Sequence, residues 1–144
     1  MGNPAGEFDF FGSKLFIQGQ RFFKELQEIQ FYADQVLTNY QNRSGSQIES
    51  VRVRKRKGNQ EAHYEFESRT IAIPVDANWA MKELVVLHEL AHHITWQKDP
   101  NVQAHGPEFL QLFLDIVMQE MGSEVALILR AALDAQGLRI EILK

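Results

Sequence analysis

The sequence predicts an α+β domain in which helices lie before and after a short antiparallel sheet. Residues 20–40 carry apolar side chains at intervals of three and four, which is the period of an amphipathic helix. Between residues 48 and 73 the apolar side chains alternate with polar ones, as they do in half-buried strands. After residue 84 long apolar segments return, interrupted near residues 100 and 122, and they indicate three further helices.

The composition is that of an ordinary globular domain. Of the 144 residues, 44% are hydrophobic and 24% are charged, and this length supports one core. We expect residues 1–20 to form a flexible, aromatic-rich lead and residues 21–144 to form a single domain. No signal peptide and no membrane-spanning apolar run is recognisable, so we expect a cytoplasmic protein without a membrane partner. The net charge of -4 excludes an overall basic field of the kind that attracts nucleic acids.

The alternating segment predicts three strands. Its apolar positions are Ile48, Val51 and Val53, then Ala62, Tyr64 and Phe66, then Ile71 and Ile73. A polar turn at residues 57–60 and a break at residues 68–69 separate them, so we expect an antiparallel meander in which consecutive strands pair. The basic residues of the first hairpin are Arg52, Arg54, Lys55, Arg56 and Lys57. They predict either a solvated face, neutralised by Glu61, Glu65 and Glu67, or a strip that binds nucleic acid.

The next segment, residues 84–97, holds the pattern His-Glu-Leu-Ala-His inside an apolar helical run. Each helical residue advances about 100°, so His88 and His92 lie on one face, one turn apart, where both imidazoles can share a metal ion. Glu89 lies at the edge of the same face, where its carboxylate can accept a proton from water activated by the metal. The spacing therefore predicts two metal ligands and a general base.

A third ligand is expected at the start of the following helix. Pro107 suits the first helical turn and Gly122 marks the end, which places His105 just ahead of the helix. Catalytic zinc sites hold the metal through three protein ligands, so we expect His105 to complete the site, with Glu108 as the alternative. The chain has no cysteine, so thiolate ligands are excluded. A last helix is predicted over residues 124–136, followed by a strand-like tail at residues 138–143.

Together, residues 88–92 and the segment His105-Gly106-Pro107-Glu108-Phe109 resemble the SprT-like branch of zincin metallopeptidases. The likeness covers about residues 48–121 and is strongest to the short single-domain metallohydrolases of actinobacteria and their phages. It implies a zincin-like order of N-terminal helix, strand meander, active helix and ligand helix. It also implies that His88, His92 and His105 bind one zinc ion per chain, that Glu89 is the general base, and that peptide bonds are hydrolysed.

The sequence therefore predicts a zinc-dependent metallopeptidase that acts on a protein or peptide. Two alternatives stay open: a non-catalytic zinc-binding scaffold or regulatory module, and a DNA-associated SprT-like protein that uses the basic residues 52–57. The residues next to the predicted cleft are His63, Tyr64, Arg69 and His93, and each is either a participant in the site or an ordinary packed residue. Sequence patterns do not decide between these roles.

Overall fold

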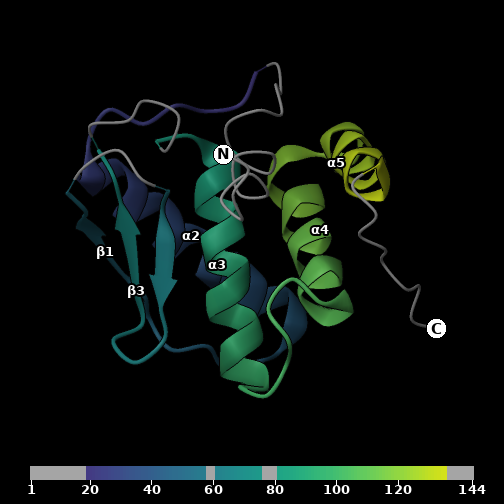
Figure 1. Ribbon diagram of the computed structural model, residues 1–144, viewed down its shortest axis with the longest axis horizontal. Helices are drawn as coiled ribbons and strands as arrows, with labels where there is room; N and C mark the ends of the chain where they lie inside the picture. The colour runs from purple at the N-terminus through teal and green to yellow at the C-terminus, as the bar shows by residue number, and fades with distance from the viewer. Residues whose placement is uncertain (1–18, 58–60, 76–80, 136–144) are drawn as a thin grey trace.

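The computed structural model describes residues 19–57, 61–75 and 81–135, and within these residues it confirms the predicted α+β class (Figure 1). Four helices and one three-stranded sheet are present in this part of the chain. In chain order they are α2 (Leu26–Ser44), β1 (Arg52–Lys55), β2 (His63–Glu65), β3 (Thr70–Ile73), α3 (Glu83–Lys98), α4 (Pro107–Met121) and α5 (Ser123–Ala135). Residues 1–18 of the predicted lead, which we expected over residues 1–20, and the tail at residues 138–143 lie outside the described residues.

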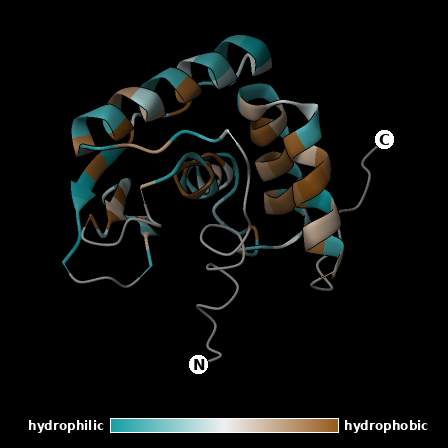
Figure 2. Cartoon of the chain, turned by 90° about the horizontal axis from the view of Figure 1, so that it is seen from above, coloured by the Kyte–Doolittle hydropathy of each residue, from teal (hydrophilic) through white to brown (hydrophobic). Residues whose placement is uncertain are grey.

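Helix α3 is the centre of the molecule. Figure 2 shows it end-on, with α2, the sheet and α4 arranged around it. Because neighbours surround it, most of its residues are buried, including Leu87, Leu90 and Ile94, which have no exposed surface. The helix that carries the predicted metal ligands is therefore held by the core of the domain rather than by a surface contact.

The N-terminus of α3 is capped by a segment that is distant in sequence. The N-cap residue Lys82 provides no side-chain hydrogen bond. Instead, the carbonyl of Arg21 accepts the N–H of Glu83 at 2.9 Å, and Oε1 of Gln20 accepts the N–H of Leu84 at 3.0 Å. These two bonds satisfy backbone donors that have no partner within the helix.

This contact also corrects the predicted start of the first helix. We expected a helix over residues 20–40, but α2 spans Leu26–Ser44 because Phe22 forms an isolated antiparallel bridge with Lys82. Residues 21–23 are thus extended rather than helical. At its other end α2 continues past the expected stop to Gly45, whose φ of 75° suits a residue without a side chain.

The sheet differs from the expected antiparallel meander. Its order is β1-β3-β2, with β1 parallel and β2 antiparallel to β3. All four residues of β3 are buried, whereas β1 and β2 are partly exposed. The most apolar strand therefore takes the central position, where it has partners on both sides, and the polar strands form the edges. The predicted hairpin between the first two strands is wrong for this reason.

Helices α4 and α5 pack against each other beside α3, and Gly122 joins them. Helix α4 begins at Pro107 and ends before Gly122, as expected, and it packs against both α3 and α5. Helix α5 buries Ala126, Leu129 and Leu133, while Leu127 and Ile128 on its other side are exposed. Within the described part of the chain, no helix combines the length and apolar character needed to cross a membrane.

Candidate metal centre

Three histidine side chains meet between α3 and α4. His88 and His92 project from successive turns of α3, and His105 lies in the loop directly before α4. The Nε2 atom of His105 is 3.2 Å from Nε2 of His88 and 3.1 Å from Nε2 of His92. The structure thus brings together the three residues that the sequence singled out as metal ligands, with their ligand atoms all within 4.8 Å of one another.

The spacing of these nitrogens fits a shared cation. Two imidazole nitrogens bound to one tetrahedral zinc ion at about 2.0–2.1 Å lie about 3.3–3.4 Å apart. The two observed separations from His105 are close to this value. A neutral imidazole nitrogen carries one hydrogen or one lone pair, so Nε2 of His105 can form a good hydrogen bond with only one of its two neighbours. A metal ion between the rings accepts all three lone pairs, and the site therefore fits a metal better than a hydrogen-bonded cluster.

The position of His105 depends on an unusual backbone. Its φ is 61°, in the left-handed region that residues with side chains rarely adopt. The following Gly106 is buried, and a Cβ at that position would lie 3.2 Å from the carbonyl oxygen of Gln103. The loop is therefore tightly folded where it presents the third imidazole. Glu108, the alternative ligand from the sequence, is exposed and is not part of the histidine cluster.

Aromatic residues of α4 hold the imidazoles in place, a feature that we did not predict. The ring of Phe109 stacks on His92, with centroids 4.2 Å apart, and meets His105 edge to face at 5.1 Å. Phe113 contacts His88 in the same edge-to-face manner at 5.4 Å. The available signal was the position of Phe109 in the first turn of the helix that directly follows the proposed ligand. These contacts restrict the rotamers of the three histidines before any metal binds.

Burial keeps the two helical imidazoles neutral. It lowers the pKa of His88 to about 3, and burial together with the neighbouring imidazoles lowers the pKa of His92 to about 3. The 2.9 Å contact between Nδ1 of His88 and Oε2 of Glu89 is therefore a hydrogen bond of a neutral imidazole rather than an ion pair of a charged one. Neutral imidazoles have the lone pair that a metal requires.

Glu89 is buried beside the histidine cluster. Only 2% of its surface is exposed, and this desolvation raises the pKa of its carboxyl to about 7. Its carboxylate faces a small cavity of about 190 Å³, whose lining also includes His63, Tyr64, His92 and His105. Glu89 therefore opens onto the same space as two of the three imidazoles, which is where a general base would act.

Tyr64 and His93 form a buried pair on the sheet side of this cavity. Nε2 of His93 donates to the carbonyl of Glu49 at 2.7 Å, so its Nδ1 accepts the hydroxyl hydrogen of Tyr64 at 2.6 Å. Burial raises the pKa of Tyr64 to about 12, which keeps the phenol protonated. His93 is thus a packed residue that orients Tyr64. Arg69 is exposed and lines neither the small cavity nor the larger one next to it.

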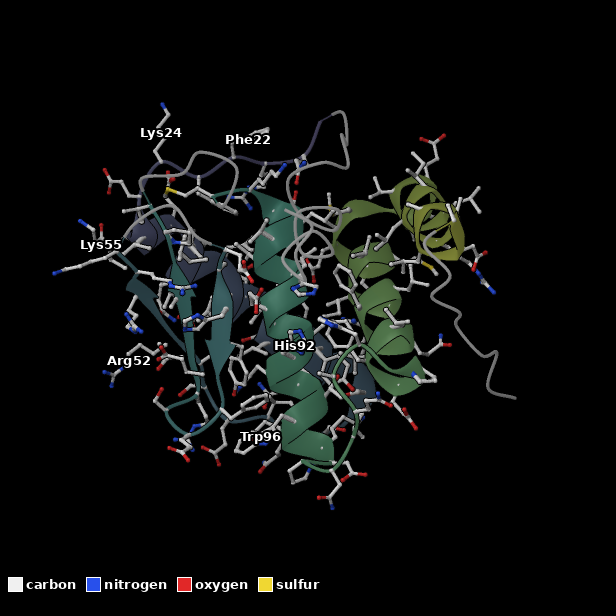
Figure 3. The ribbon with its side chains drawn as sticks, viewed as in Figure 1. Phe22, Lys24, Arg52, Lys55, His92 and Trp96 are labelled. Carbon is white, nitrogen blue, oxygen red and sulfur yellow. The ribbon has the colours of Figure 1, made fainter. Side chains whose placement is uncertain are left out.

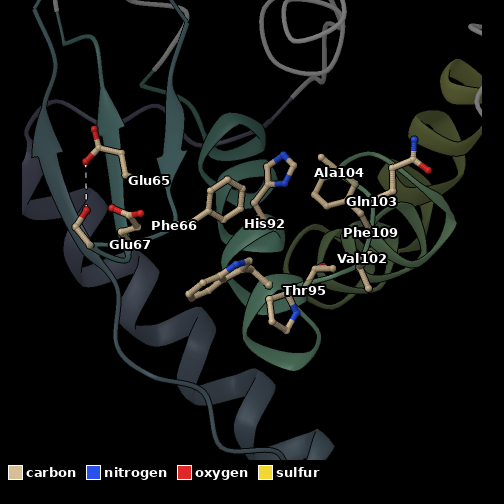
Figure 4. A pocket seen from close by; sticks show the side chains of 12 residues that line it. Glu65, Phe66, Glu67, His92, Thr95, Val102, Gln103, Ala104 and Phe109 are labelled. Atoms are coloured by element: carbon tan, nitrogen blue, oxygen red, sulfur yellow. Dashed lines mark hydrogen bonds between the residues drawn. The ribbon is translucent and has the colours of Figure 1, made fainter.

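A larger open cavity of about 780 Å³ adjoins the cluster (Figure 4). Its lining comes from the end of β2 and the turn between β2 and β3, from the C-terminal half of α3, and from the loop between α3 and α4 together with the first turn of α4. Its lining residues are Glu65, Phe66, Glu67, Ser68, His92, Thr95, Trp96, Pro100, Val102, Gln103, Ala104 and Phe109. We call this cavity the groove. It has room for several residues of an extended peptide.

The basic residues of β1 lie away from this site. Figure 3 shows Arg52 and Lys55 projecting from the far edge of the sheet, on the opposite side from His92. Arg54, on the same strand, pairs with Glu65 across the sheet, as the interpretation of a neutralised face expected. The basic residues of β1 therefore lie on a different surface of the molecule from the histidine cluster.

Comparison with known protein families covers both the fold and the histidine cluster. The model of the SprT-like family matches residues 20–127, which include α2, the sheet, α3, α4 and the three histidines. Comparisons with curated proteins and with solved structures gave no significant match.

Proposed function

The chain belongs to the SprT-like family, and from this membership and the geometry of the site we propose that it is a zinc-dependent metallopeptidase. The observation that carries the proposal is the convergence of three imidazole nitrogens next to a buried carboxylate that faces the same cavity. In this proposal His88, His92 and His105 bind the metal, and Glu89 is the general base. The substrate is a protein or peptide.

The donor set supports zinc as the metal. Three neutral nitrogen donors suit a borderline-soft cation such as zinc better than calcium or magnesium, which prefer oxygen ligands. Three protein ligands also leave one coordination position for water or substrate, which distinguishes catalytic zinc sites from structural ones with four protein ligands. We therefore propose one zinc ion per chain. When bound, zinc would supply Lewis acidity that polarises a carbonyl group and lowers the pKa of water.

The residues of the chain would perform the proton transfers. Glu89 would accept a proton from the attacking water at a carboxylate oxygen and then donate it to the leaving amine nitrogen. Burial raises the pKa of this carboxyl to about 7 in the metal-free protein, and a bound zinc ion would oppose that rise and favour the carboxylate form that accepts the proton. Phe109 and Phe113 would keep the imidazoles oriented, and Tyr64 would form the sheet-side wall of the cavity.

The test combines metal content with peptide hydrolysis. We expect the purified protein, supplied with zinc, to contain one zinc ion per chain by elemental analysis and to cleave an unfolded protein substrate. His105→Ala should lose most of the metal, because only two ligands remain. Glu89→Gln should retain the metal but lose about 10²–10⁴-fold in turnover, the usual contribution of a general base.

Two further variants provide controls. His63→Ala removes a histidine that lines the small cavity but lies outside the cluster, and Glu108→Gln removes the alternative ligand. Both should keep the zinc. A Glu89→Gln protein that is metal-replete and fully active would refute the proposed mechanism. Zinc binding without hydrolysis by the protein with Glu89 intact would instead support the scaffold alternative.

A further inference from the structure

The groove next to the histidine cluster has an apolar floor that is open to solvent. Phe66 is 45% exposed although it is a large aromatic residue, and its ring lies 5.8 Å from that of Trp96, centroid to centroid. Figure 4 shows Phe66 from the β2–β3 turn and Val102 from the opposite loop facing the space between them. Exposed aromatic rings that are grouped in a concave surface are typical of binding sites, because a ligand that covers them removes apolar surface from water, which is favourable.

One wall of the groove carries negative charge. Glu65 and Glu67 both line it, and the lining contains no lysine or arginine. Glu65 is paired with Arg54 and His63, so its charge is largely compensated. Glu67 is exposed, and among the described residues no hydrogen bond or ion pair engages its carboxylate. Glu67 is therefore the acidic group available to a bound cation.

The groove is continuous with the small cavity that holds the general base. Phe66, His92 and Ala104 line both spaces. A chain lying in the groove would thus pass directly from the aromatic floor to the histidine cluster. In an extended peptide each residue advances about 3.3 Å, so a side chain over Phe66 would belong to a residue within one or two positions of the bond at the cluster.

From these observations we propose that the groove selects peptide substrates with an aromatic or large aliphatic side chain next to the cleaved bond and a lysine or arginine within two residues of it. The apolar side chain would cover Phe66 and Trp96, and the basic side chain would pair with Glu67. This inference rests on the proposed function, because it assigns the substrate class of the same site.

Binding can be measured separately from cleavage. The protein is zinc-loaded Glu89→Gln, which should bind peptides without turning them over. The probes are fluorescein-labelled octapeptides that differ only at two positions: Phe with Lys two residues later, Ser with the same Lys, and Phe with Glu in place of Lys. We expect the Phe–Lys peptide to bind about tenfold more tightly than either of the others, as measured by fluorescence anisotropy.

Variants of the groove assign the preference to its residues. Phe66→Ala, in the same background, should remove the advantage of Phe over Ser, because the aromatic floor is lost. Glu67→Lys should reverse the preference between Lys and Glu: the affinity for the Phe–Lys peptide should fall about fivefold and the affinity for the Phe–Glu peptide should rise about fivefold. The matched controls are Ile128→Ala and Glu124→Lys, which change an apolar residue of similar exposure, 48% against 45% for Phe66, and an exposed acidic residue, both on α5. Both controls should leave all three affinities unchanged.

The outcomes separate this inference from the proposed function. Equal binding of the three peptides, or preferences that Phe66→Ala and Glu67→Lys leave intact, would overturn the groove as the specificity site. Selective binding that depends on these residues supports the inference, and cleavage of the same Phe–Lys peptide by the protein with Glu89 intact then tests the proposed function. If that protein binds the peptide selectively but never cleaves it, the proposed hydrolysis fails while the binding preference stands.

Discussion

Glu89 carries its carboxyl group in a buried position, where ionisation costs free energy. It is almost completely buried, and its one hydrogen-bond partner in the described residues is Nδ1 of the neutral His88. Burial of an ionised carboxylate without a cation destabilises the folded state. A residue that destabilises the metal-free protein but lies at the proposed catalytic position is what a trade-off between stability and activity predicts.

This cost should be visible in the pH dependence of stability. Folding raises the pKa of Glu89 from 4.5 to about 7, so the folded state loses stability relative to the unfolded state as the pH rises through this interval. We therefore expect metal-free Glu89→Gln to be more stable than the metal-free parent at pH 8, by up to about 3 kcal/mol. The difference should vanish near pH 4. Urea denaturation in the presence of a chelator measures it.

The exposed Glu108 supplies the control for this experiment. It lies in the first turn of α4, where a carboxylate is mildly stabilising, so Glu108→Gln should change the free energy of unfolding by less than about 1 kcal/mol and with the opposite sign. A Glu89→Gln protein whose stability tracks the parent at every pH would show that burial does not penalise the carboxylate.

At the scale of elements, the local patterns located most strands and helices but not their partners. Alternating apolar residues predicted three strands, and all three are present. The pairing was wrong because strand order depends on which strand is buried on both faces, and β3 takes the centre of the sheet. Likewise, the helical period at residues 20–25 is overridden by the bridge between Phe22 and Lys82. Local propensity does not contain these long-range contacts.

The loop between α3 and α4 is the element on which the third imidazole depends. Gly106→Ala would place a Cβ 3.2 Å from the carbonyl oxygen and 3.3 Å from the Cβ of Gln103, so the loop must shift by a few tenths of an ångström. Since His105 is the adjacent residue, its Nε2 should move away from the other two imidazoles. We expect zinc affinity to fall about tenfold, as measured by competition with a chromogenic chelator.

Two comparisons isolate the cause of that loss. Ala104→Ser, on an exposed position of the same loop, should leave the affinity unchanged because its side chain already projects into the groove. Helix content and the cooperativity of unfolding should be the same in Gly106→Ala and the parent. Full zinc affinity in Gly106→Ala would mean that the loop accommodates a side chain without moving His105.

At the scale of the whole molecule, the site divides into a part encoded in short stretches and a part created by folding. Helical spacing predicted that His88 and His92 share one face with Glu89 beside them, and the structure places His105 with them. The groove was not predicted, because it joins the β2–β3 turn, α3 and the following loop. The stacking of Phe109 on His92 was missed for the same reason, since no local pattern specifies which side chain a ring will meet.

Zinc binding should stabilise α3, the loop after it and the start of α4 more than the rest of the domain. The three imidazoles connect α3 to the loop before α4, whereas no residue of α2 or the sheet belongs to the cluster. The hydrophobic core is extensive and includes none of the three histidines proposed to bind the metal, so we expect the metal-free chain to stay folded. Free zinc at a hundredfold excess over its dissociation constant should add about 2.7 kcal/mol to the free energy of unfolding.

In hydrogen exchange, the protection added by zinc should be greatest at residues 99–110. His105→Ala should show neither effect, and protection spread evenly over α2 and the sheet would contradict a site that bridges α3 and α4.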